Sequence, residues 1–264
     1  MVAGKTKITW ADHTQNFWEG CTRVSPACDH CYAASRAYRF KTVEWDAPPR
    51  RTSPARWKEP FKWDRDAAAA GVLRRVFSLS LGDFFDNQVP PEWRAEAWEV
   101  IAGCRNLDWM ILTKRPQNTA KMLPGGWPWP HVWLGATAEN QAEADRRLPI
   151  LLRIPAAVHF ASVEPQLEPV DLRRYLASGL GWALVGGESL AGCRPFDPDW
   201  ARVLRDQCRA AGAAFFLKQL GGYPNPRHHL EDLPSDLRIR EWPVGRQVGP
   251  KPASAHPPQL ALSL

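Results

Sequence analysis

The sequence has no long apolar run and no apolar segment at its N-terminus. None of the hydrophobic stretches in its 264 residues approaches the roughly 18 to 20 residues that a membrane span requires. The opening residues, MVAGKTKITWADH, carry charge but no hydrophobic core of a secretory signal. We therefore expect a soluble, cytoplasmic protein, and a reducing compartment disfavours disulfide bonds.

Two familiar functional patterns are also missing. No glycine-rich dinucleotide-binding fingerprint follows an early strand, which argues against a dinucleotide-binding fold. The six cysteines do not form the framework of a small secreted protein, because three lie within residues 21–31 and Cys104, Cys193 and Cys208 are scattered. Metal or redox chemistry explains such a cluster better than disulfide pairing does.

Positive charge and tryptophan are abundant instead. The formal net charge of +6 favours a polyanionic partner, although solvated lysine and arginine side chains alone also produce such a value. Fourteen tryptophans exceed what a domain of this size needs, and aromatic rings beside basic groups stack on nucleic-acid bases. We expect most of these tryptophans to pack in the core or at its rim.

Strand-like and helix-like segments alternate along the chain. Short apolar, β-rich segments predict strands at 75–81, 108–113, 131–136, 157–163, 182–185 and 214–217. Helical periodicity predicts helices at 92–102, 117–122, 141–153, 171–178 and 197–211. This alternation predicts an α/β fold with parallel strands, as a complete or partial β/α barrel.

We expect one barrel domain over residues 1–223. Residues 40–65 are rich in proline, basic groups and tryptophan, and they predict an inserted ordered loop that contacts nucleic acid. Residues 224–264 form a C-terminal extension, of which 249–264 is expected to be disordered.

Polar residues follow directly after the predicted strands, where the mouth of a barrel lies. Helix capping and loop solvation account for part of this distribution. The residues are Asp83, Asp86, Lys114, Arg115, Thr137, Glu139, Glu164, Glu188, Ser189, Lys218 and Gln219.

The cysteine cluster carries the most specific chemistry. Cys21, Cys28 and Cys31 have the spacing C-x6-C-x2-C. A structural zinc site normally takes four protein ligands, so zinc would have to recruit His30, His13 or a remote cysteine. A 4Fe-4S cluster held by three thiolates keeps one iron open to a small molecule. Thiolates suit both metals, and the spacing alone does not choose between them.

The triplet in the first loop of a β/α series, with His30 before the last cysteine, resembles the radical S-adenosylmethionine (SAM) superfamily. That superfamily's motif, C-x3-C-x-aromatic-C, has a shorter first gap. The whole pattern is similar to a phage and bacterial three-cysteine-motif family placed near that superfamily, over residues 5 to about 223. The motifs that carry this resemblance are TQNFWEGCTRVSPACDHCYA, SLGDFFD, LTKRP, SVEP, VGGES and FFLKQLGG.

The resemblance implies an enzyme, a lyase or a transferase, that uses a 4Fe-4S cluster and S-adenosylmethionine. The cluster ligands would be the three clustered cysteines, and the open iron would chelate the methionyl amine and carboxylate. Reductive cleavage of the sulfonium would then give methionine and a 5′-deoxyadenosyl radical. An electron donor such as flavodoxin or ferredoxin would be required.

The resemblance places the other site residues less directly. The superfamily's Gly-Gly-Glu segment follows the second strand, whereas Gly186, Gly187 and Glu188 follow a late one. Position along the barrel instead assigns cofactor binding to Ser80, Asp83, Asp86, Thr113 and Lys114. His30 and Tyr32, which flank the last cysteine, are expected to bind the cofactor as well. Glu164 and Glu188 are expected as catalytic carboxylates, and Cys193 as a hydrogen-atom donor.

The leading hypothesis is a radical SAM enzyme that acts on nucleic acid, DNA more than RNA, or on a nucleotide-like substrate, as a DNA repair lyase or in base modification. One alternative is a zinc or iron-sulfur nucleic-acid-binding protein without radical chemistry. Another is a radical SAM enzyme acting on a small metabolite or peptide.

Overall fold

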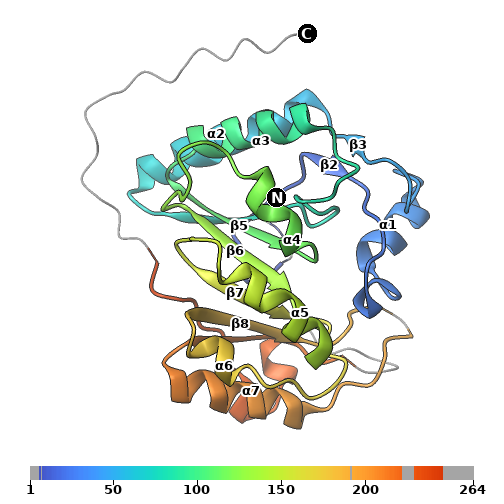
Figure 1. Ribbon diagram of the computed structural model, residues 1–264, viewed down its shortest axis with the longest axis vertical. Helices are drawn as coiled ribbons and strands as arrows, with labels where there is room; N and C mark the ends of the chain where they lie inside the picture. The colour runs from blue at the N-terminus through green and yellow to red at the C-terminus, as the bar shows by residue number, and fades with distance from the viewer. Residues whose placement is uncertain (1–5, 7, 191, 222–228, 246–264) are drawn as a thin grey trace.

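The six predicted strands all form, and they pair in parallel in one curved sheet (Figure 1). The computed structural model describes residues 6, 8–190, 192–221 and 229–245. Seven strands follow the order β1-β4-β5-β6-β7-β8-β9, and the sheet curls into a half-barrel, so the predicted partial β/α barrel is confirmed. The strands are β1 His13–Gln15, β4 Arg74–Ser78, β5 Leu107–Thr113, β6 Val132–Thr137, β7 His159–Val163, β8 Leu180–Gly186 and β9 Ala214–Gln219.

Helices connect the strands and cover the convex face of the sheet. In Figure 1, α2 and α3 lie together over one end of the sheet and α6 and α7 over the other. A small antiparallel pair, β2 Trp18–Glu19 with β3 Arg50–Arg51, stands apart from the main sheet. The helices are α1 Tyr32–Phe40, α2 Pro54–Ala70, α3 Pro91–Gly103, α4 Pro116–Thr119, α5 Gln141–Leu151, α6 Arg173–Leu176 and α7 Pro198–Ala211.

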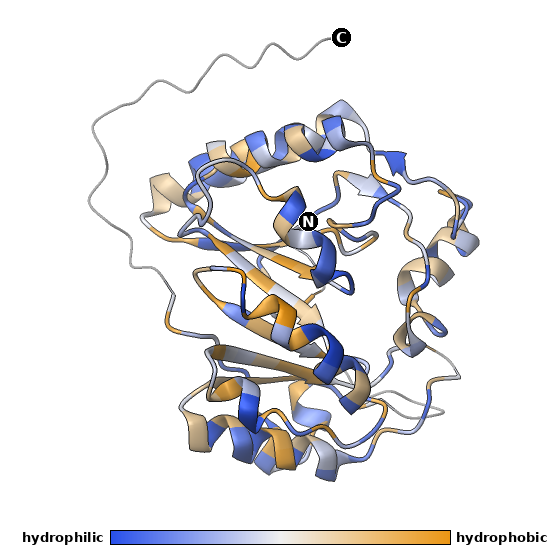
Figure 2. Cartoon of the chain, viewed as in Figure 1, coloured by the Kyte–Doolittle hydropathy of each residue, from blue (hydrophilic) through white to orange (hydrophobic). Residues whose placement is uncertain are grey.

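Each face of the sheet has its own apolar core, because neighbouring side chains along a strand point to opposite faces. On the convex face, strand residues such as Trp109 and Ile111 pack against helix residues such as Ala97 and Leu204. The hydropathy colouring accordingly shows the central strands mostly hydrophobic and the outer helices striped in both colours (Figure 2). The concave face carries a separate aromatic cluster of Trp10, Phe77, Met110, Trp133, Phe160, Trp182, Leu184 and Phe216.

The segment after β9 packs against the aromatic cluster on the concave face. The Leu217 amide donates to the carbonyl of Ile239, and the Glu241 amide donates to that of Phe215. The Trp242 indole then donates to the Trp10 carbonyl at 3.1 Å. The first and last described segments therefore meet at the aromatic cluster. The tryptophans in this cluster pack in the core, as expected.

Helix α2 corrects the prediction of a loop at 40–65, because a helix begins at Pro54 within that range. The segment did not look helical because Pro60 lies inside it, and an interior proline leaves a carbonyl of the preceding turn without a donor. Here the side-chain amide of Gln15 donates to that freed carbonyl, of Arg56, at 3.0 Å. A side chain from a distant segment thus supplies the hydrogen bond that the helix cannot form at its proline.

No helix within the described ranges is long and apolar enough to span a membrane. The expected disordered segment 249–264 lies outside the described residues.

Candidate functional site

A cavity of about 370 Å³ opens at the carboxyl ends of the strands, where a β/α barrel carries its active site. All three clustered cysteines line it. So do His30 and Tyr32, which flank Cys31. Most of the residues predicted from their positions after the strands also line it, namely Ser80, Asp83, Thr113, Lys114, Glu164, Glu188, Lys218 and Gln219. Its volume lies within the range of small-molecule sites. The fold thus brings segments from both ends of the chain to one cavity.

The backbone places each cysteine by a different local device. Cys21 follows Gly20, whose φ of +113° favours glycine and whose amide donates to the Leu81 carbonyl at 2.9 Å. Cys28 ends a short 3₁₀ turn, Pro26–Cys28. Cys31 is the N-cap residue of α1. All three thiols are free of disulfides, as the sequence predicts.

Arg115, just after β5, fixes the first part of the cysteine loop. Its guanidinium donates to the Thr22 carbonyl at 2.8 Å and approaches the Cys21 sulfur at 3.5 Å. It also pairs with Asp83 at 3.1 Å and with Asp86 at 3.0 Å, and all three side chains are buried. Burial lowers the pKa of Arg115, but Asp83 and its other anionic neighbours raise it overall, so this cation stays charged.

The Cys21 thiol lies in this charged surrounding. Burial raises its pKa to about 12, Asp83 adds to the rise, and Arg115 opposes it. A bound metal would replace the thiol proton, because thiolates are the ligand form.

Glu139, just after β6, holds the middle of the loop. Its carboxylate accepts from the Ala27 amide at 3.3 Å and from the fully buried Arg147 at 2.7 Å. Burial raises the pKa of Glu139, but the Arg147 charge together with hydrogen bonds from Ser25 and the backbone lowers it overall. The ion pair thus presents a fixed acceptor to the cysteine loop.

Glu188, after β8, holds the last part of the loop. The His30 ring nitrogen Nδ1 lies 2.9 Å from its carboxylate, and the Arg194 Nε donates to it at 2.8 Å. Burial raises the pKa of Glu188, but the hydrogen bonds from Arg194 and His30 hold it below its usual value. Arg194 also donates to the Pro26 carbonyl at 2.9 Å. Three separate strand ends therefore anchor the loop that carries the cysteines.

Some of the remaining polar groups in the cavity wall are already bonded to other protein groups, and others are not. The Tyr32 hydroxyl donates to the Ser80 carbonyl at 2.6 Å, and Lys218 forms an ion pair with Glu164. The Lys114 backbone amide donates to Asp83, while its ammonium forms no ion pair within 4.0 Å among the described residues and acts on Glu139 only through its charge. The cavity thus offers one cation suited to an anionic group of a ligand.

Two further features indicate that the cavity is shaped for a ligand. A Cβ atom at Gly187 would lie 2.3 Å from the Gly221 backbone nitrogen, so only glycine permits this close approach of β8 and β9 at the wall. Thr137 Oγ1 and Trp10 Nε1 are buried polar atoms of lining residues and have no hydrogen-bond partner among the residues that the structure describes. Buried groups of this kind normally have one.

The donor set consists of three free thiols, which are ligands that iron-sulfur clusters and zinc both accept. Within the described residues, no three His, Cys, Asp or Glu side chains are gathered to hold one metal ion. In a 4Fe-4S cluster each of the three thiolates would bind a different iron. The three free thiols all line one cavity, which is compatible with that mode of binding.

The predicted site residues fall into three groups. Ser80, Lys114, Glu164, Glu188, His30 and Tyr32 line the cavity. Asp83 and Thr113 also line the cavity, and together with Asp86 they fix the loops around Arg115; Asp86 is not among the lining residues. Cys193 is buried and is not among the lining residues, so its role as hydrogen-atom donor stays a prediction.

Sequence reasoning placed Arg115 and Glu139 at the barrel mouth but gave them no role, and it did not single out Thr22 or Arg194. Their function depends on contacts between segments far apart in the sequence, such as the 112 residues between Ala27 and Glu139. The only sequence signal is their place after strands, which Arg115 and Glu139 share with the residues that line the cavity.

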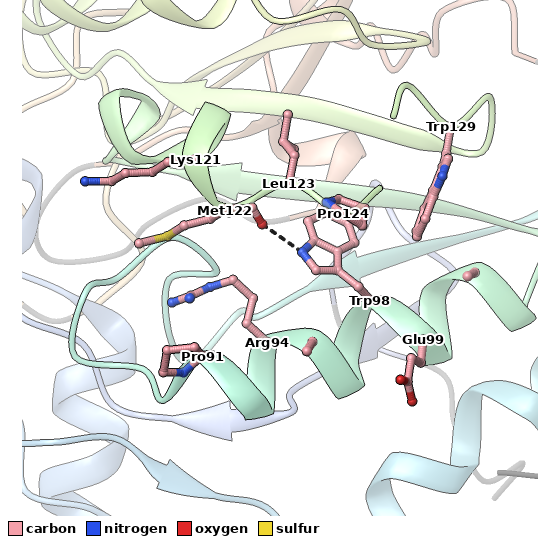
Figure 3. A pocket seen from close by; sticks show the side chains of 11 residues that line it. Pro91, Arg94, Trp98, Glu99, Lys121, Met122, Leu123, Pro124 and Trp129 are labelled. Atoms are coloured by element: carbon pink, nitrogen blue, oxygen red, sulfur yellow. Dashed lines mark hydrogen bonds between the residues drawn. The ribbon is translucent and has the colours of Figure 1, made fainter. Parts of the chain in front are cut away.

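A second cavity, of about 650 Å³, lies between α3 and the segment 121–129 (Figure 3). Its lining is mostly apolar and contains no cysteine. The Trp98 indole donates across it to the Met122 carbonyl at 2.9 Å, and Arg94 is turned to the carbonyls of Phe84 and Asp86. It is larger than the cysteine-lined cavity, and its charged lining residues are Arg94, Glu99 and Lys121.

Comparisons with known proteins give one family and one structure. A family model described as a protein of unknown function, DUF5131, matches residues 5–248. No curated protein matches significantly. One solved structure is a spore photoproduct lyase mutant with bound AdoMet and dinucleoside spore photoproduct. It is 13% identical, has a TM-score of 0.46, and the match covers 84% of this chain and 70% of that one.

Proposed function

This chain belongs to the DUF5131 family, whose function is unknown, and we propose that it is a radical SAM enzyme that acts on nucleic acid or a nucleotide-like substrate. The observation that carries the proposal is the gathering of Cys21, Cys28 and Cys31 with polar residues from several strand ends around one cavity. The sequence motifs that resemble the radical SAM superfamily supply the same three cysteines independently.

Cys21, Cys28 and Cys31 would hold a 4Fe-4S cluster. When bound and reduced, such a cluster with one open iron supplies the electron that cleaves S-adenosylmethionine to methionine and a 5′-deoxyadenosyl radical. The cytoplasm suits this chemistry because it keeps the thiols reduced, and a donor such as flavodoxin or ferredoxin would deliver the electron.

The protein's own share is to position and protect. Arg115, Glu139 and Glu188 hold the cysteine loop in place through hydrogen bonds to its backbone or side chains. Lys114 is positioned to pair with a carboxylate such as the methionyl group. The apolar lining residues Trp10 and Phe77 keep water from the floor of the cavity.

The nucleic-acid substrate is proposed from charge. The chain has a net charge of +6, and the long helix α2 exposes basic residues within the segment expected to contact nucleic acid. DNA repair by a lyase and base modification are the two reaction types that suit such a substrate.

The test is anaerobic reconstitution with iron and sulfide, followed by reduction in the presence of S-adenosylmethionine. We expect the wild-type protein to form 5′-deoxyadenosine and Cys28→Ala to form none, because the cluster loses a ligand. Cys208→Ala is the matched control, since Cys208 is also buried but belongs to α7. It should retain the activity.

Three outcomes would overturn all or part of the proposal. A cluster-loaded protein that makes no 5′-deoxyadenosine would be an iron-sulfur binding protein without radical chemistry. A protein that takes up zinc alone would favour the zinc-binding alternative. If only a small metabolite or peptide is converted, the proposed radical chemistry would stand and the proposed nucleic-acid substrate would be wrong.

A further inference from the structure

Exposed apolar side chains are concentrated beside the cysteine-lined cavity. Six large hydrophobic residues are exposed in the described part of the chain, and Val203 and Val244 are the two outside residues 24–40. The other four are Val24, Tyr32, Tyr38 and Phe40. Tyr38 is 89% exposed and Phe40 57%. Single exposed apolar residues are common on proteins, but a local concentration of them is typical of a surface that binds a partner.

Helix α1 does not need these rings in order to pack. Its buried residues are Ala33 and Ala37 alone, which lie on one side of the helix. Tyr32, Arg36 and Phe40 are spaced four residues apart and therefore form a stripe on another side. At a rise of 1.5 Å per residue, this stripe runs about 12 Å outward from Tyr32, which lines the cavity.

The stripe combines an aromatic face with positive charge. The Arg36 and Arg39 guanidinium carbons lie 5.1 and 5.4 Å from the centre of the Phe40 ring. No acidic residue occurs within α1, and Lys41 follows it directly. Neither arginine has a carboxylate partner among the described ion pairs. Arginines with free charge around an exposed ring match the phosphates and bases of a single-stranded nucleic acid.

We propose that α1 is a docking surface for a single-stranded stretch of nucleic acid that leads into the cavity. A base stacks on Phe40, and Arg36 and Arg39 pair with the neighbouring phosphates. The inference rests on the proposed nucleic-acid substrate and specifies which surface binds it. A single strand is favoured over a duplex because stacking on Phe40 requires an unpaired base face.

The experiment measures binding of fluorescent oligonucleotides to the full chain, loaded with cluster, by anisotropy over a salt series. Single-stranded DNA, single-stranded RNA and duplex DNA of equal length are the probes. Phe40→Ala should weaken single-strand binding about 5- to 100-fold with little change in salt slope, because it removes stacking. Phe40→Trp should restore it. The double variant Arg36→Ala with Arg39→Ala should make the negative slope of log K against log salt shallower by about 1.4, because two phosphate contacts are lost.

Matched controls lie on α7, away from the cavity. Val203→Ala removes an equally exposed apolar side chain and Arg209→Ala an exposed cation, and neither should change binding. Equal losses in Phe40→Ala and Val203→Ala would overturn the inference. So would tighter binding of duplex, or self-association of the wild type that Phe40→Ala abolishes. Wild-type 5′-deoxyadenosine formation without oligonucleotide tests the proposed function separately, so the two failures are distinguishable.

Discussion

At the scale of single residues, the ion pairs already formed around the cavity determine which charges are left to bind a ligand. Lys218 is paired with Glu164, and Arg115 with Asp83 and Asp86, whereas Lys114 forms no ion pair within the described ranges. A paired charge holds the protein together, and an unpaired one beside a cavity is available to a ligand.

Lys114→Ala should therefore weaken binding of S-adenosylmethionine by about 10- to 100-fold, the range for losing a hydrogen bond to a charged group. Equilibrium dialysis with cluster-loaded protein measures this. Lys121→Ala, which removes a lysine from the second cavity, is the control. Equal affinity in the two variants would show that Lys114 does not contact the cofactor.

The buried pair of Glu139 and Arg147 leads to a prediction about acid stability. The folded state lowers the pKa of Glu139, so its contribution to stability is complete above the ordinary glutamate value of about 4.3 and is lost as the pH falls below it. Glu139→Gln should flatten this acid dependence of the unfolding free energy. Urea unfolding at a series of pH values measures it.

Arg147→Met tests the same pair from the other side. It leaves the Glu139 carboxylate buried without its cation, so we expect a loss of about 3–5 kcal/mol in unfolding free energy at neutral pH. Glu99→Gln, at an exposed position on α3, should change neither quantity. Unaltered stability of Arg147→Met would contradict the role given to this pair.

At the scale of elements, the sequence predicted the helices and strands whose pattern lies within the segment itself. The strands from β4 to β9 are short apolar segments, and the helices α3 and α7 have clear starts. Strand β1 was missed because it has three residues, HTQ, and little apolar character. Helix α2 was taken as a loop because Pro60 interrupts it, and its compensation by Gln15 comes from another segment.

The approach of β8 and β9 at the cavity wall gives a prediction at this scale. Gly187→Ala should destabilise the protein by about 1–3 kcal/mol and weaken cofactor binding, because its Cβ would clash with the Gly221 backbone. Gly181→Ala, within β8, is the control, since its nearest neighbouring atom would be 3.8 Å away. Thermal unfolding and binding of S-adenosylmethionine distinguish the two. If both variants behave alike, the close approach is not required.

At the scale of the whole molecule, the half-barrel explains why residues so distant in sequence meet. Parallel strands place their carboxyl ends on one edge, so the segments after β4, β5, β6, β7, β8 and β9 all face the cysteine loop. Sequence position predicted this gathering for Lys114 and Glu188. It did not reveal that α1 carries exposed rings beside the cavity, because exposure depends on which neighbours pack against a helix.

The central claim is that Cys21, Cys28 and Cys31 hold a 4Fe-4S cluster with an iron open to S-adenosylmethionine. The most direct measurement is metal and sulfide analysis with electron paramagnetic resonance of the anaerobically reconstituted, reduced protein, with and without S-adenosylmethionine. We predict about four irons per chain and a signal that changes when the cofactor is added. A colourless protein with a single zinc, or a cluster that survives replacement of all three cysteines, would contradict the account.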